Sequence, residues 1–187
     1  TAVEGAADDF TLIGGVGGLG QQVIISAGSL RDSIGIVFFD NALYELTESI
    51  VISITDVTNA NNGGLTRYYN VMDNEPKPHH NIYQDTTVSE GDGVVEVPVT
   101  IDQIASMDLK VYFRTAGLAT KGAGGDYTVE ASPVTIPSGS LSTTISITLV
   151  DDSRYEPSQP FNLIIDSVSN ASRLTIDTIC VVTIDDD

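Results

Sequence analysis

The sequence reads VVEVPVTI over residues 94–101, a stretch in which apolar side chains recur at every second position. Residues 144–149, TISITL, alternate in the same way, and residues 34–38 repeat the pattern earlier in the chain. This period of two is typical of a β-strand with one buried face. Clusters of Gly, Pro, Asn and Ser separate the strands at the spacing of a β-sandwich. The pattern therefore predicts an all-β protein of short antiparallel strands.

The charge of the chain is strongly one-sided. Its 187 residues include 26 Asp and Glu against 8 Lys and Arg, a formal net charge of −18. This excludes nucleic acid as a partner, because few cations are present to replace the counterions of phosphates. The same balance disfavours anionic membranes, and no apolar run approaches the roughly 20 residues of a membrane span, so we expect no direct membrane insertion. An acidic chain of this kind suits the binding of cations or a salty extracellular medium.

An internal repeat organises the sequence. Residues 23–30, VIISAGSL, align with residues 134–141, VTIPSGSL, at an offset of 111. The same offset pairs Asp40 with Asp151 and Glu45 with Glu156, and an extra slip of one residue pairs Asp73–Glu75 with Asp185–Asp187. Residues 82–125 have no counterpart in the first copy, which therefore begins in the middle of a fold. Two prolines near residues 75–80 mark the boundary, and we predict domains over residues 1–78 and 79–187.

The motifs of the second copy resemble the Calx-β repeat. They are SEGDG at 89–93, GGDY at 124–127, VDD at 150–152, YE at 155–156 and TIDDD at 183–187, in that order. The resemblance covers nearly all of residues 82–187, and the first copy looks like the back part of a second such repeat. It implies tandem immunoglobulin-like antiparallel β-sandwiches, the first of which lacks its N-terminal strands. It also implies a calcium-linked module, as in sodium–calcium exchangers, adhesion receptors and sponge aggregation factors.

The resemblance implies a set of calcium ligands in each copy. Calcium takes six to eight hard oxygen ligands, which suits carboxylates that converge from several loops at one pole of a sandwich. In the second copy the matching positions are Glu90, Asp126, Asp151, Asp152, Glu156, Asp185, Asp186 and Asp187. Gln159 stands where the family often has a further acidic residue, which disfavours a second ion in this cluster. In the first copy the matching positions are Asp9, Asp40, Glu45, Glu48, Asp73 and Glu75.

The first copy has no counterpart of Glu90, so we expect its site to be weaker or to use a residue from elsewhere. The alternative for both clusters is a set of solvated acidic turns that bind no metal. We also expect no enzyme activity, because the two histidines are adjacent in the linker and no nucleophile with a base is evident. Asn170 begins the sequon Asn170-Ala171-Ser172 and is a candidate for glycosylation in a secreted protein.

These observations favour a calcium-binding structural or adhesion module of a multi-repeat extracellular protein, in which Ca²⁺ stiffens the repeat junctions. A calcium-independent spacer of a surface protein and a cytosolic calcium-sensing module remain open. The partners would be neighbouring repeats or adhesion partners. We further expect another polypeptide, such as an upstream fragment, to complete the first sandwich with about three strands and a glutamate equivalent to Glu90, because unpaired edges and apolar faces invite pairing.

Overall fold

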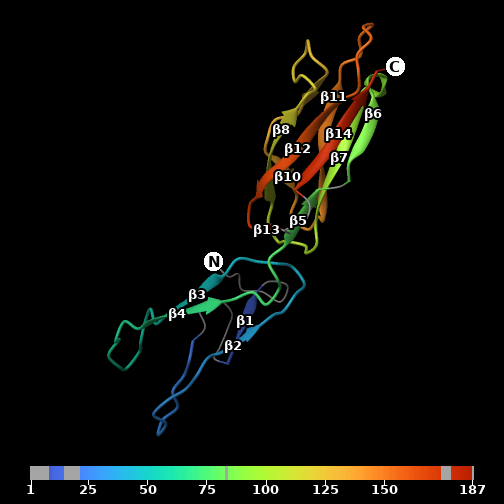
Figure 1. Ribbon diagram of the computed structural model, residues 1–187. Helices are drawn as coiled ribbons and strands as arrows, with labels where there is room; N and C mark the ends of the chain where they lie inside the picture. Colours follow the sequence, from blue (N-terminus) through green and yellow to red (C-terminus); the bar gives the residue numbers. More distant parts are fainter. Residues whose placement is uncertain (1–8, 15–21, 83, 174–177, 187) are drawn as a thin grey trace. The chain divides into compact units, whose positions relative to one another are not determined.

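A computed structural model describes residues 9–14, 22–82, 84–173 and 178–186 (Figure 1). The chain divides into two compact units. Unit 1 comprises Thr1–Ala42 and Leu46–Asn74, and unit 2 comprises Leu43–Glu45 and Glu75–Asp187. Within the described part of the chain, no helix is long and apolar enough to cross a membrane.

Unit 2 is a sandwich of two five-stranded sheets (Figure 1). One sheet has the order β10-β8-β12-β14-β6 and the other the order β13-β5-β7-β11-β9. Most neighbouring strands are antiparallel, whereas β13 with β5 and β14 with β6 are parallel. The elements are β5 (His79–Ile82), β6 (Thr86–Ser89), the 3₁₀ turn η1 (Glu90–Asp92), β7 (Val94–Ile101), β8 (Leu109–Gly117), β9 (Tyr127–Val129), β10 (Val134–Ile136), β11 (Ser142–Leu149), β12 (Gln159–Val168), β13 (Ser172–Arg173) and β14 (Ile179–Asp185).

The core of unit 2 lies between these two sheets. The alternating residues of β7 and β11 turn one side inward, where Val97, Val99 and Ile145 are buried. Tyr127 and Phe161, one from each sheet, stack with ring centroids 3.9 Å apart. Each fully buried aliphatic or aromatic side chain of this kind stabilises the fold by about 1.5–3 kcal/mol. The all-β sandwich predicted from the period of two is confirmed.

Unit 2 also includes a short segment that lies early in the sequence. The Tyr44 amide donates to the Ile104 carbonyl (2.8 Å), and the Tyr44 carbonyl accepts from the Ser106 amide (3.0 Å). The Tyr44 side chain packs against the core of unit 2. These contacts explain why Leu43–Glu45 belongs to unit 2 while the residues on either side of it belong to unit 1.

Unit 1 contains two two-stranded antiparallel sheets. In one, β1 (Phe10–Ile13) pairs with β2 (Gly35–Phe38), and in the other β3 (Glu48–Ser53) pairs with β4 (Thr66–Val71). Among the described apolar residues of unit 1, Phe10 and Ile50 are the ones that are buried. A two-stranded sheet is at best marginally stable in water, so unit 1 is sparsely supported by its own core.

The strand pairs of unit 1 correspond to pairs in unit 2. Phe10 lies opposite Phe38, as Tyr127 lies opposite Leu149. The pair β1–β2 thus has the register of β9–β11, and the offset from Phe38 to Leu149 is the 111 residues of the sequence repeat.

The second pair, β3–β4, has the register of β12–β14. The Ile54 amide donates to the Leu65 carbonyl (3.0 Å), as the Ile165 amide donates to the Thr178 carbonyl (2.8 Å). From Leu65 to Thr178 the offset is 113, one more than the sequence alignment used for the last strand. By this register, Asp73 occupies the position of Asp186.

Candidate metal centre

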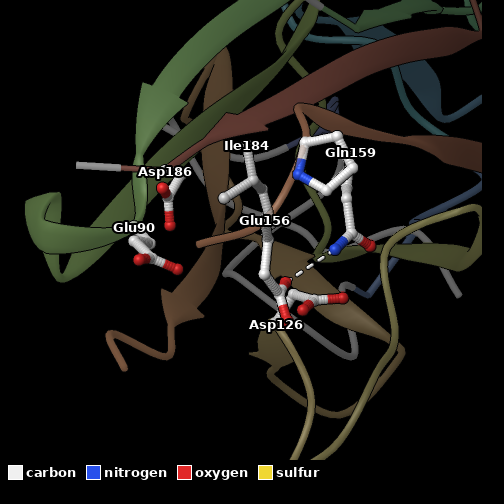
Figure 2. A pocket seen from close by; sticks show the side chains of 7 residues that line it. Glu90, Asp126, Glu156, Gln159, Ile184 and Asp186 are labelled. Atoms are coloured by element: carbon white, nitrogen blue, oxygen red, sulfur yellow. Dashed lines mark hydrogen bonds between the residues drawn. The ribbon is translucent and has the colours of Figure 1, made fainter. Parts of the chain in front are cut away.

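An acidic pocket lies at one end of unit 2 (Figure 2). We call it the acidic pocket, and its lining residues are Glu90, Asp126, Glu156, Pro157, Gln159, Ile184 and Asp186. Pro157 and Ile184 were not predicted from the sequence, because apolar wall residues carry no signature of a ligand.

Strand direction brings four distant carboxylates to this pole. Because β6 and β14 are parallel and end together, with Ser89 beside Asp185, Glu90 and Asp186 emerge at the same end of their sheet. In the other sheet β11 ends where β9 begins, and the Leu149 amide donates to the Gly93 carbonyl (2.7 Å), which joins that end to the segment after η1. Asp126 directly precedes β9.

Glu90 is the most enclosed of the acidic side chains. Only 7% of its surface is exposed. It opens η1, a turn held by Ser89, whose amide donates to the Asp92 carboxylate (2.8 Å). An ionised carboxylate is costly to bury unless hydrogen bonds or a cation compensate for the lost water. A buried acid in the wall of a pocket lined by other acids is a feature that suits a cation site.

Asp126 and Glu156 crowd each other on the other side of the pocket, where Figure 2 shows their carboxyl groups side by side. Partial desolvation raises the pKa of Glu156, and so do the charges of Asp126 and Asp152 and a hydrogen bond with Asp126. The Gln159 amide donates to Glu156 Oε2 (2.7 Å), and the Thr120 amide donates to the Asp126 carboxylate. The raised pKa records a repulsion that a bound cation would relieve.

Other acids predicted for the second copy do not line the pocket. Asp151 and Asp152 are exposed, and Asp152 Oδ1 accepts from the Arg154 amide (2.6 Å). Asp185 is half-buried at the end of β14 but is not part of the lining. Asp187 lies outside the described residues.

The candidates of the first copy fall into pairs. Asp9 and Asp40 flank one end of the β1–β2 pair, where the Phe39 amide donates to the Asp9 carbonyl (2.9 Å). Glu48 lies opposite Val71, so Glu48 and Asp73 share one end of the β3–β4 pair. The remaining two candidates, Glu45 and Glu75, belong to unit 2.

The chemistry of the acidic pocket fits a hard cation. Its possible ligands are four carboxylates and one amide, without the His or Cys ligands that favour zinc or copper. Among the described residues, no group of three or more Asp, Glu, His or Cys side chains already has the arrangement of a formed metal centre. The pocket therefore presents the ligand types for calcium, with the carboxylates still apart.

Asn170, the glycosylation candidate, lies in the turn between β12 and β13. The residue is exposed, with a left-handed backbone (φ 52°), and its side-chain amide donates to Met107 Sδ (3.6 Å).

Comparison with known proteins identifies relatives of unit 2. The model of the Calx-beta domain family matches residues 73–187. The apo form of the Calx CBD1 domain is similar in structure, with 21% identity and a TM-score of 0.50, over 60% of this chain and 99% of that one. The calcium binding domain CBD12 of CALX1.1 has 25% identity and a TM-score of 0.51, and CBD12 from CALX1.2 has 24% and 0.51. Each of these two matches covers 58% of this chain and 44% of the other. No curated protein matches the chain.

Proposed function

Because the chain belongs to the Calx-beta family, we propose that unit 2 binds Ca²⁺ in the acidic pocket. The observation that supports this most directly is the convergence of Glu90, Asp126, Glu156 and Asp186 on one pocket. A solved structure with 25% identity, described as a calcium binding domain, has a similar fold. Four carboxylates offer up to eight oxygen atoms, which matches the six to eight that calcium takes.

The residues of the pocket would divide the work of binding. Glu90 and Asp186 approach from the sheet that contains β6 and β14, whereas Asp126 and Glu156 come from the loops beside β9 and β12. A calcium ion would neutralise their mutual repulsion and hold these loops to one another. Gln159 would contribute a neutral amide oxygen or remain a donor to Glu156.

The cellular setting that we propose is extracellular, within a multi-repeat adhesion or matrix protein. Calcium outside cells reaches millimolar levels, at which weak modules with dissociation constants of about 10⁻⁴–10⁻³ M are occupied. The net charge of −18 and the internal sequence repeat support this setting. Neighbouring repeats or adhesion partners would then contact a surface whose loops are held by calcium, and Asn170 would carry a glycan.

Calcium in the acidic pocket would stiffen one particular end of unit 2. The pocket lies where β14 ends, whereas β5 begins at the other end, with His80 opposite Ile101 at the far end of β7. The ion would therefore stiffen the pole at which β14 leaves the sandwich. The linker that enters unit 2 near residues 75–80 lies at the opposite pole.

Titration calorimetry on the full chain tests this proposal. We expect calcium to bind with a dissociation constant of about 10⁻⁴–10⁻³ M, and Glu90→Gln to weaken that binding. Asp166→Asn is the matched control, because Asp166 forms an exposed ion pair with Arg114 (3.0 Å) and does not line the pocket. Absence of binding at 10 mM calcium would favour the calcium-independent spacer. Submicromolar affinity would favour the cytosolic calcium sensor.

A further inference from the structure

Apolar side chains that would face a core are half exposed in unit 1. Phe38 is 51% exposed, whereas Leu149, its counterpart 111 residues later, is 5% exposed. Ile54 is 50% exposed, whereas its counterpart Ile165 is 2% exposed. The strand registers around these residues agree, so the contrast reflects missing cover and not a different backbone.

In unit 2 the cover comes from β7 and β8. β11 pairs with β7 on the edge away from β9, and β12 pairs with β8 on the edge away from β14. In the part of unit 1 that the structure describes, β2 pairs with β1 alone and β3 with β4 alone. The edges that correspond to the β7 and β8 contacts are therefore open.

The open edges are specific in register. In β11, Ile147 lies opposite Val95 and the Leu149 amide donates to the Gly93 carbonyl (2.7 Å). Ile36 and the Phe38 amide occupy the same positions in β2. An edge with this pattern and an apolar face beside it is a template for pairing with another strand.

We propose that unit 1 binds a segment of a separate polypeptide that supplies two β-strands of the β7–β8 type. One strand would add to β2 and cover Phe38, and the other would add to β3 and cover Ile54. The segment would have apolar residues at every second position and a short connection between its two strands, as residues 94–117 have. This interaction is independent of calcium binding in the acidic pocket.

Hydrogen–deuterium exchange on the full chain provides the test, with a synthetic peptide of residues 90–117 as the probe. We expect the peptide to form a one-to-one complex and to slow amide exchange in residues 35–38 and 50–54 at least tenfold.

Two matched variants localise the effect. Ile54→Asp should abolish the protection, because this side chain corresponds to the buried Ile165. Val51→Asp should retain it, because Val51 is equally exposed (49%) but corresponds to the half-buried Asn162. Equal loss in both variants would overturn the assignment of the covered face.

Three further outcomes would overturn the proposal. Slow exchange in residues 35–38 of the monomeric chain without peptide would mean that no cover is missing. Protection that appears with a dimer of the chain would identify a second copy as the occupant. Protection only when residues 90–117 are fused ahead of Thr1, and not with free peptide, would place the strands on the same polypeptide.

Discussion

Removing two carboxylates from the acidic pocket should uncouple the stability of unit 2 from calcium. The perturbation is Asp126→Asn combined with Asp186→Asn, which halves the number of acids that line the pocket. A ligand that binds only the folded state stabilises it by RT ln(1 + [L]/Kd). At 10 mM calcium and a Kd of about 10⁻⁴–10⁻³ M, this is about 1.4–2.7 kcal/mol. For a unit of this size, about 1 kcal/mol corresponds to roughly 4 °C, so the parent chain should gain about 6–11 °C.

The double variant should gain less than about 2 °C from calcium. Loss of an outer-shell partner alone weakens metal binding about 10–100-fold, and a loss of about 100-fold reduces the stabilisation to about 0.4 kcal/mol or less. The variant should also melt at the same temperature as the parent or higher in EDTA, because Asp126 is one of the charges that raise the pKa of Glu156. This opposite response in the two buffers distinguishes a ligand from a merely structural residue.

The assay is thermal unfolding followed by circular dichroism, in EDTA and in 10 mM calcium, with Asp166→Asn as the control that keeps the full gain. If the double variant gains as much from calcium as the parent chain, calcium does not bind where we propose, and the acidic pocket is a cluster of solvated acids.

Three further predictions concern the ion, the pH dependence and the packing of unit 2. Magnesium at equal concentration should raise the melting temperature less than calcium, because it requires a tight octahedron and loses water reluctantly; equal gains would indicate charge screening. Burial lowers the pKa of His80 below its ordinary 6.5, so the folded state binds fewer protons than the unfolded one. Stability should therefore fall as pH drops below about 6.5, and His80→Asn should lose this slope in melts between pH 8 and 5.5. Gly117→Ala should destabilise unit 2 by about 1–3 kcal/mol in urea unfolding, because a Cβ would collide with Phe161 Cα and approach the Pro160 carbonyl oxygen to 2.7 Å. Gly124→Ala, where a Cβ meets open space, should be nearly neutral, and a similar loss in both would contradict the packing argument.

Local pattern was sufficient to predict the fold class and much of the candidate site. The alternation in residues 94–101 predicts both a strand and its buried face, since side-chain direction in a strand depends only on the parity of the position. The motif order likewise predicted acids at strand ends, and four of the predicted residues line the acidic pocket: Glu90, Asp126, Glu156 and Asp186.

Only the tertiary structure decides which acids share a pocket. Asp151 and Asp152 are as acidic and as close to a strand end as Asp126, yet they are exposed while Asp126 lines the pocket. The difference arises from pairing between strands far apart in sequence, which sets where each loop points. The same holds for Val51 and Ile54, which are equally apolar and equally exposed. Their different counterparts in unit 2 follow from which sheet face each occupies, and a face becomes core only when a second sheet covers it.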